Sequence, residues 1–357
     1  MVTCLTDYAE QAKTILPPEV WDYVEGGAGD EQAVRANTAA FRSTRVLPRV
    51  LSGGGKAGTA TTLLGTSADT PLAVAPMAYQ ALLHPDGEAA LARAASAAGV
   101  PFVVPMLSSV ALEDVAESGA ELWLQLYWPR ERAVLRDLVA RAEDSGVRAL
   151  VLTVDLPVMG RRLRDLRNAF ALPPHIRAAN LDPAFGAAAR TRRDGASAIA
   201  GHTTVAFEPA LGWSDVEWLR GATELPLVLK GVLDPRDAAL AVEAGVSGVV
   251  VSNHGGRQLD RAVPALTALP AVRDAVAGRC AVLLDGGVRS GSDILCALAR
   301  GADAVLVGRP LLWALACGGE DPARDALGLL ADELATALTV SGCRDLTHAR
   351  ALTVSAG

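Results

Sequence analysis

The sequence lacks three features that would each assign it to a class of proteins. It has no excess of basic residues: 33 Lys and Arg against 40 Asp and Glu give a formal net charge of -7. Nucleic acid is therefore not expected as a partner, because phosphate binding favours a basic surface. Apolar runs have the length of strands rather than the roughly 20 residues that span a bilayer. The N-terminus has no basic and then apolar run of a signal peptide, so we expect a cytoplasmic protein without membrane attachment.

Cysteine is also scarce. The five cysteines are odd in number and far apart, with no Cys-x-x-Cys pair and no histidine at metal-ligand spacing; they are Cys4, Cys280, Cys296, Cys317 and Cys343. This pattern favours neither a disulfide framework nor a zinc site. We expect reduced cysteines that mostly serve packing, and no bound metal.

Hydrophobic residues, by contrast, are abundant and regularly placed. They make up 50% of the 357 residues, which suits one large α/β domain. From residue 71 onward, a short apolar run followed by a helical stretch occurs eight times; the runs start near Leu72, Pro101, Leu122, Ala149, Pro226, Gly248, Ala281 and Ala304. Apolar strands alternating with helices predict a parallel sheet covered by helices, and eight of them predict a closed (β/α)8 TIM barrel.

The remaining segments are fitted to this barrel. We expect a single domain over residues 1–357, in which residues 1–70 form a mostly helical prelude and residues 71–357 the barrel. Proline at 17 and 18 and glycine at 26, 27 and 29 divide the prelude into helices. The longest interruption, about residues 160–225 between the fourth and fifth strands, is predicted to form a mobile flap.

One loop has an unusual composition. The stretch SNHGGRQLD, residues 252–260, directly follows the apolar run at 248–251. Its two glycines permit a close approach to the main chain, its imidazole can take a proton near neutral pH, and its guanidinium can bind two carboxylate oxygens. The stretch alone is consistent with a ligand site and also with an ordinary glycine-rich loop.

Polar residues follow most of the other runs as well. In a barrel of this kind, chemistry takes place at the C-terminal ends of the strands, so this arrangement indicates a functional site. DGGVRSG at 285–291 and GRP at 308–310 place glycine amides and two arginines at the starts of helices, which is typical of a phosphate site, although two tight turns would also explain them.

Lys230 ends the fifth run in apolar surroundings and needs a partner. That partner is either a carbonyl substrate bound as a Schiff base, as in an aldolase, or a flavin ring that becomes anionic on reduction.

Six motifs occur in a fixed order between about Tyr23 and Gly319. They are DYVEGGAGDE, LAVAPMAYQ with HPDGE after it, WLQLY, TVDLPVMGRR, SNHGGRQLD and LLDGGVRSGSDILCALARGADAVLVGRP. Together they resemble the FMN-dependent α-hydroxy-acid oxidases and dehydrogenases. The resemblance implies oxidation of an (S)-2-hydroxy acid to the 2-oxo acid. Ala78 favours O2 as the electron acceptor, and a dehydrogenase with another acceptor is the alternative. No Rossmann fingerprint is present, so a nicotinamide is not expected.

The resemblance also implies roles at the substrate side. His254 would be the base that takes a proton from the substrate, and Asp155 would stabilise the resulting imidazolium. Arg162 and Arg257 would bind the substrate carboxylate. Tyr23 and Tyr127 would supply two phenols, one on the carboxylate and one near the reacting oxygen. The neighbouring Arg161, Arg164 and Arg167 are expected to form a solvated charged face.

On the cofactor side, the resemblance implies a strand-end site for FMN. The expected residues are Pro76, Met77, Ala78, Ser108, Gln125, Thr153, Lys230, Ser252, Asp285, Gly287, Arg289, Gly308 and Arg309. Lys230 would lie beside N1 and O2 of the flavin, where a positive charge favours the reduced anion. Where many relatives carry a serine at the end of strand two, this chain has Pro105, and either Ser108 or a backbone group is the candidate replacement.

Substrate size and assembly are predicted from weaker signals. Large apolar or aromatic residues near the strand ends are compatible with an aryl substituent; they are Met77, Tyr79, Met106, Leu107, Trp128 and Met159. We therefore expect an aromatic 2-hydroxy acid, with a lactate- or glycolate-type substrate as the alternative. Relatives are often tetramers, so a homo-oligomer is expected.

Overall fold

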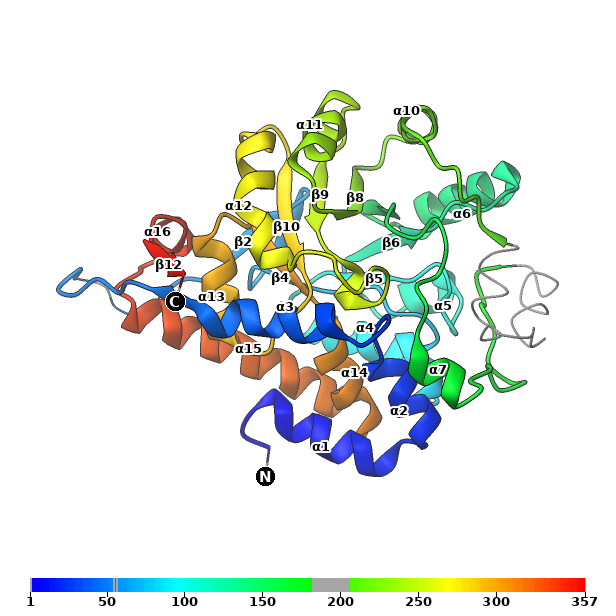
Figure 1. Cartoon of the computed structure of the whole chain (residues 1–357), viewed down its shortest axis with the longest axis horizontal. Coiled ribbons are helices and arrows are strands. Elements are labelled where there is room, and N and C mark those ends of the chain that lie inside the picture. Colours follow the sequence, from blue (N-terminus) through cyan, green and yellow to red (C-terminus); the bar gives the residue numbers. More distant parts are fainter. Residues whose placement is uncertain (1, 54, 56, 182–205, 357) are drawn as a thin grey trace.

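A computed structural model of the protein describes residues 2–53, 55, 57–181 and 206–356. Figure 1 shows the strands near the centre of the molecule with helices around them. Eight parallel strands close into a barrel, in which neighbours in space are neighbours in sequence, and the circle closes where β11 pairs with β4. The strands are β4 (Leu72–Val74), β5 (Phe102–Val104), β6 (Leu122–Leu126), β7 (Ala149–Thr153), β8 (Leu227–Val232), β9 (Gly248–Val251), β10 (Ala281–Asp285) and β11 (Ala304–Val307). The predicted (β/α)8 barrel is confirmed, and each predicted apolar run contains one of its strands.

Helices follow the strands, and local signals fix where several of them begin. Pro235 opens α11, and Asp234 caps it by accepting a hydrogen bond from the Arg236 N–H. Ser290 caps α13 in the same way, through the Asp293 N–H at 3.2 Å. The described helices outside the prelude are α4 (Gly87–Ala97), α5 (Leu112–Ala116), α6 (Arg132–Asp144), α7 (Leu163–Arg167), α10 (Trp213–Arg220), α11 (Pro235–Glu243), α12 (Ala265–Val276), α13 (Gly291–Ala299), α14 (Arg309–Ala316), α15 (Glu320–Val340) and α16 (Leu346–Arg350), with 3-10 turns η1 (Gln80–Leu82) and η3 (His254–Gly256).

The prelude is helical only in its first part. The helices α1 (Leu5–Ile15), α2 (Pro18–Glu25) and α3 (Gln32–Ser43) break at the predicted proline and glycine positions. Beyond them the described residues up to 70 form strands, turns and irregular loops, whereas the sequence predicts a mostly helical segment over residues 1–70. Threonines and glycines disfavour helix in this stretch. It forms β1 (Thr44–Val46), which pairs antiparallel with β12 (Val354–Ala356), and a hairpin of β2 (Thr61–Leu63) and β3 (Thr66–Ala68).

The barrel interior is filled by side chains from alternate strand positions. Trp123, Val151 and Val228 belong to one fully buried cluster, to which the hairpin adds Leu63 and Ala68. The hairpin therefore covers the N-terminal end of the barrel. An open cavity lies instead at the C-terminal ends of the strands.

The predicted flap is only partly described. Its residues 160–181 include α7, and its residues 206–225 include α10, whereas residues 182–205 lie outside the described part of the chain. The prediction that this segment is mobile therefore stays a prediction. Among the described helices, none is both long enough and apolar enough to cross a bilayer.

Candidate active site

A cavity lies at the C-terminal end of the barrel. Most of the residues predicted for the site line it. They are Tyr23, Pro76, Met77, Ala78, Gln125, Tyr127, Thr153, Arg162, Lys230, His254, Arg257, Asp285, Gly287, Arg289, Gly308 and Arg309. Residues that are far apart in sequence thus meet around one volume, as the barrel topology predicts.

His254 and Asp155 form a hydrogen-bonded pair beside the cavity. His254 Nδ1 lies 2.9 Å from Asp155 Oδ1, which leaves Nε2 as the ring nitrogen available to a ligand. The other oxygen of Asp155, Oδ2, is buried without a hydrogen-bond partner among the described residues. Burial lowers the pKa of His254 below its usual value, although the charge of Asp155 opposes this shift. The imidazole is therefore neutral at pH 7 and can accept a proton.

The backbone around His254 is held in an uncommon conformation. His254 has a φ of 57°, a left-handed value that is rare for residues other than glycine. Its backbone N–H donates to Ser252 Oγ at 3.0 Å, and Gln258 Nε2 donates to the backbone oxygen of Asp155 at 2.9 Å. At Gly256, an added Cβ would lie 2.6 Å from the backbone N of Val34, so only glycine permits this approach of α3.

A second polar group, at the floor of the cavity, consists of Lys230, Asp285 and Ser252. Lys230 Nζ lies 2.8 Å from Asp285 Oδ2, and Ser252 Oγ donates to the same oxygen at 2.7 Å. Burial opposes both charges, but each partner stabilises the other: the pKa of Lys230 is raised and that of Asp285 is lowered. The lysine is therefore a paired ammonium at neutral pH.

Two guanidiniums and two phenols share one side of the cavity. Arg162 is only 7% exposed, and its Nε has no hydrogen-bond partner among the described residues. Burial and the nearby Arg257 lower the pKa of Arg162 to about 10, so it stays charged. Arg257 lies over the ring of Tyr23, 5.4 Å from the ring centroid. Burial raises the pKa of Tyr127, whose phenol therefore stays protonated as a donor.

Two further arginines lie at the other side, after β10 and β11. Burial lowers the pKa of both Arg289 and Arg309, the latter to about 9. Arg309 donates to the backbone oxygens of Val24 and Gly255, each at 3.1 Å. Arg289 packs 5.1 Å from the centre of the Trp313 ring. Within the described residues neither arginine has a carboxylate at ion-pair distance, so two buried cations beside glycine amides fit a phosphate.

Three predicted residues lie outside the cavity lining. Asp155 stands behind His254, and Ser252 stands behind Lys230 and Asp285. Ser108 is fully buried, and its hydroxyl accepts a hydrogen bond from the Val110 N–H at 3.2 Å. Ser108 does not line the cavity, and its contact with the cofactor stays a prediction.

Other predictions for the site also need correction. Of the large side chains proposed to surround an aryl group, Met77 lines the cavity. The other five do not line it: the buried core contains Tyr79, Met106, Leu107 and Trp128, and Met159 packs at the edge of that core. The apolar wall includes Val24, Leu83 and Leu312, which sequence reasoning missed. Val24 lies on α2, Leu312 on α14 and Leu83 just after η1, so a search of the strand ends alone does not find them.

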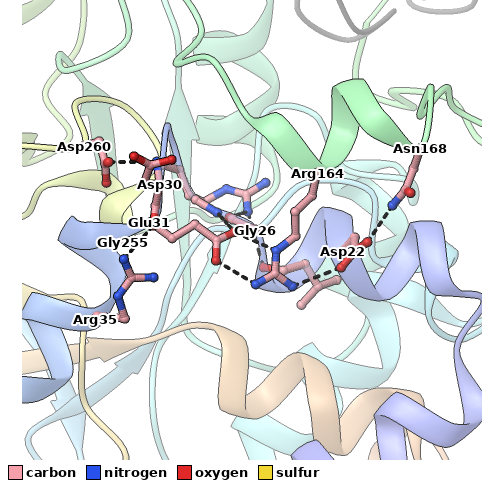
Figure 2. Close-up of polar contacts among 12 residues, drawn as sticks. Asp22, Gly26, Asp30, Glu31, Arg35, Arg164, Asn168, Gly255 and Asp260 are labelled. Atoms are coloured by element: carbon pink, nitrogen blue, oxygen red, sulfur yellow. Dashed lines mark hydrogen bonds and ion pairs between the residues drawn. The ribbon is translucent and has the colours of Figure 1, made fainter.

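Arg164 also departs from the expected solvated face. Its guanidinium forms two hydrogen bonds with the carboxylate of Glu31, at 2.6 and 2.7 Å, and a third with Asp22 at 3.0 Å. Figure 2 shows it reaching from α7 to the end of α2. Arg161 and Arg167 are exposed, as expected.

Comparison of the sequence with known protein families identifies the class of protein to which this barrel and its strand-end cavity belong. A family model described as FMN-dependent dehydrogenase matches residues 12–355, and the chain belongs to this family. FMN is therefore its cofactor, and the cavity fits it, since paired Lys230 and the two buried arginines supply cationic partners for a flavin ring and a phosphate.

Individual relatives match along nearly the whole chain. A 4-hydroxymandelate oxidase of Amycolatopsis orientalis is 51% identical, over 99% of this chain and 98% of the relative. An L-lactate oxidase of Nostoc sp. is 46% identical, over 96% of this chain and 95% of the relative. A solved structure of a mandelate oxidase with (S)-4-hydroxymandelic acid is 50% identical, with a TM-score of 0.97 over 100% of this chain and 99% of that one.

Proposed function

We propose that this protein oxidises an (S)-2-hydroxy acid with an aryl side chain, of the 4-hydroxymandelate or mandelate type, to the 2-oxo acid. The two electrons and two protons go to O2, which becomes H2O2. The observation that carries this proposal is that Arg162 and Arg257 line the same cavity as His254, whose Nδ1 is bound to Asp155. A carboxylate held by the two arginines lies within the same small volume as the base.

The cofactor side is assigned from charge and position. Pro76, Met77 and Ala78 would lie along the flavin, with Gln125 and Thr153, joined at 3.1 Å, at its polar edge. Lys230 would face the ring, and Asp285 and Ser252 would hold the lysine there. The residues at the phosphate side would be Gly287, Arg289, Gly308 and Arg309. When bound, FMN supplies the acceptor for the two electrons of the substrate.

His254 carries the proton transfer. The hydroxy acid must lose a proton as its electrons leave, and a neutral imidazole facing the cavity can accept that proton at Nε2. Asp155 then faces an imidazolium at 2.9 Å, and its negative charge stabilises that product. The burial that keeps His254 neutral at rest therefore favours its role as a base.

Substrate orientation is assigned to the arginines and phenols. Arg162 and Arg257 would bind the carboxylate, where each charge-assisted hydrogen bond contributes roughly 1.5–3 kcal/mol. Tyr23 would donate to the carboxylate, and Tyr127 would donate near the reacting oxygen. Both phenols are protonated because burial raises the pKa of each.

An aryl substituent is supported by motif and by likeness. APMAYQ, LSSVALEDV and VMGRRLRDLRNAFALP resemble 4-hydroxymandelate oxidase, and relatives with that name and with the name mandelate oxidase match the whole chain. The apolar residues Met77, Leu83 and Leu312 line the cavity. A lactate- or glycolate-type oxidase remains the alternative, and a dehydrogenase with another acceptor is the alternative to O2.

The Schiff-base reaction is disfavoured by the state of Lys230. A nucleophilic lysine must lose its proton, whereas this ammonium is paired with Asp285 at 2.8 Å and has a raised pKa.

A homo-oligomer, a single domain over residues 1–357 and a cytoplasmic location stay proposals from the sequence.

The test is an assay in air-saturated buffer with (S)-4-hydroxymandelate, (S)-mandelate, (S)-lactate and glycolate as separate substrates. We expect one 2-oxo acid and one H2O2 for each O2 consumed, with kcat/KM highest for the aryl acids. Turnover that needs a dye and leaves O2 untouched would assign a dehydrogenase. A preference for lactate or glycolate would overturn the aryl assignment.

A further inference from the structure

The short helix α7 begins directly after Arg162 and presents charged side chains in opposite directions. Arg162 is buried and lines the cavity, while Arg164 turns away from it toward α2. Figure 2 shows the Arg164 guanidinium between the carboxylates of Asp22 and Glu31. One element therefore carries both a proposed substrate ligand and a connection to another segment of the chain.

This connection is well formed and partly shielded from water. Both oxygens of Glu31 accept from Arg164, which is the bidentate geometry that distinguishes strong arginine pairs from ordinary surface pairs. The exposed fractions of the side chains are 33% for Arg164, 28% for Asp22 and 18% for Glu31. Asn168, just after α7, adds a bond to the other Asp22 oxygen at 2.6 Å. Hydrogen bonding to the guanidinium lowers the pKa of Glu31, although burial opposes this.

The segment at the other end of this connection also belongs to the site. Tyr23 follows Asp22 in α2 and lines the cavity. The backbone oxygens of Val24 and Gly26 accept hydrogen bonds from Arg257. The end of α2 therefore carries one proposed carboxylate ligand and holds another in place.

Three separate segments thus supply the proposed carboxylate site, and polar contacts join them. Asp260, near Arg257, accepts hydrogen bonds from the backbone N–H groups of Asp30 and Ala33, at 2.9 and 3.2 Å. The contacts of Arg164 join α7 to α2 (Figure 2). Without Arg164, α7 loses two ion pairs, which comprise three hydrogen bonds, to the segment that carries Tyr23 and Glu31.

We propose that Arg164 is a positioning residue for the substrate. By binding Glu31 and Asp22, it holds the side chains of Tyr23 and Arg162 at the positions from which both can bind the substrate carboxylate. The inference rests on the proposed function. Arg164 does not line the cavity, so it cannot take part in proton transfer at His254. We therefore expect Arg164 to control the affinity of the site for carboxylates.

The first test compares Arg164→Met with Arg167→Met in the FMN-loaded protein. Arg167 lies on the same helix and is exposed, with no ion pair among the described residues, so its loss controls for the change in net charge. For Arg164→Met we expect the KM of (S)-mandelate and the Kd of the unreactive phenylacetate to rise roughly 10-fold, equivalent to about 1.4 kcal/mol. The kcat should stay within about twofold of wild type. Arg167→Met should match wild type in all three quantities.

A second test uses the partner carboxylate. Glu31→Gln should raise the Kd of phenylacetate in the same direction, and Arg164→Met with Glu31→Gln should be little worse than Arg164→Met alone, because the two residues share one interaction. Arg164→Lys should recover part of the affinity, since an ammonium cannot bind both carboxylate oxygens in the same way. If Arg164→Met fails to fold, Glu31→Gln and Arg164→Lys carry the test.

The outcomes separate the two proposals. A wild-type protein that binds phenylacetate but oxidises no 2-hydroxy acid would overturn the proposed function alone. Equal Kd values for phenylacetate in Arg164→Met and Arg167→Met would overturn the positioning role alone. A wild-type protein that neither binds phenylacetate nor oxidises any 2-hydroxy acid would overturn both. A fall in kcat with unchanged Kd and KM would also reject the positioning role.

Discussion

The inward-facing side chains of the barrel form two successive layers, and each strand contributes to both at positions two residues apart. The two layers differ in chemistry. Side chains two apart on a strand face the same side. In the lower layer, these positions are apolar and belong to one buried cluster: Trp123, Val151, Val228, Val250 and Leu283. In the upper layer the same strands continue with Gln125, Thr153, Lys230, Ser252 and Asp285. The comparison shows that one strand pattern builds both a packed core and a polar cavity floor.

The two layers are also stabilised by different forces. The lower layer gains from removing apolar surface from water. The upper layer buries charge, which is favourable only when every charge has a partner. Lys230 and Asp285 satisfy this at 2.8 Å, whereas the buried arginines of the site find carbonyl oxygens or no partner among the described residues. The upper layer is therefore built to receive an anion.

The largest expected effect comes from breaking the pair in the upper layer. Lys230→Met leaves Asp285 buried without its counter-charge and should cost about 3–5 kcal/mol in the free energy of unfolding. Chemical denaturation of the FMN-free protein measures this cost. Adding Asp285→Leu to Lys230→Met should recover part of it, because both charges are then gone. If the single variant is as stable as wild type, the pair does not carry the role assigned to it.

The next effect separates catalysis from packing. His254→Ala should lower the rate of flavin reduction at least about 10²-fold, because the base is lost. Leu283→Ala in the lower layer should cost about 2–5 kcal/mol of stability but leave that rate near wild type at a temperature where it is folded. Anaerobic stopped-flow absorbance measures the rate in both. Wild-type reduction by His254→Ala would contradict the assignment of the base.

Asp155→Asn should have a smaller effect. It removes one charge-assisted hydrogen bond, worth roughly 1.5–3 kcal/mol, so we expect the rate to fall about 10- to 100-fold. Because the charge of Asp155 raises the pKa of His254 against the effect of burial, its loss should also move the acid limb of the pH–rate profile to lower pH. A limb that moves to higher pH would mean that Asp155 does not act through His254.

The smallest effect is the pH dependence of the wild-type protein. Burial lowers the pKa of His254 below its usual value, so the acid limb of the kcat/KM profile should be centred below pH 6.5. The value of kcat/KM should fall as pH drops through that lowered pKa and the imidazole becomes protonated. Lys230 and Asp285 should add no transition between pH 5 and 9, since their pKa values are moved away from this range in opposite directions. Measuring kcat/KM from pH 4.5 to 9 checks both statements.

Much of the barrel follows from local pattern. Each strand is an apolar run because it is buried on both faces, and the first two prelude helices, α1 and α2, end beside a proline and a glycine. The pairing of β1 with β12 could not be predicted in this way. It joins residues 44–46 to residues 354–356, and neither segment carries a local signal that names the other.

The residues of the site also differ in whether local sequence pattern could predict them. Lys230, Asp285 and His254 could be predicted because strand ends in a barrel converge. Arg164 could not, since an arginine among three others looks like a solvated face, and its partner Glu31 is 133 residues away in sequence. The surroundings of Ser108 could not be predicted either: its position near a strand end does not indicate that its hydroxyl accepts from the Val110 N–H or that it lies outside the cavity lining.

The most direct test of the account is the visible spectrum of the purified protein under anaerobic conditions, before and after addition of (S)-mandelate. We predict yellow flavin bands that bleach with (S)-mandelate or (S)-4-hydroxymandelate, bleach far less with glycolate or lactate, and return when air is admitted. A protein whose flavin bands persist with every 2-hydroxy acid, or one that cannot take up added FMN, would contradict the account.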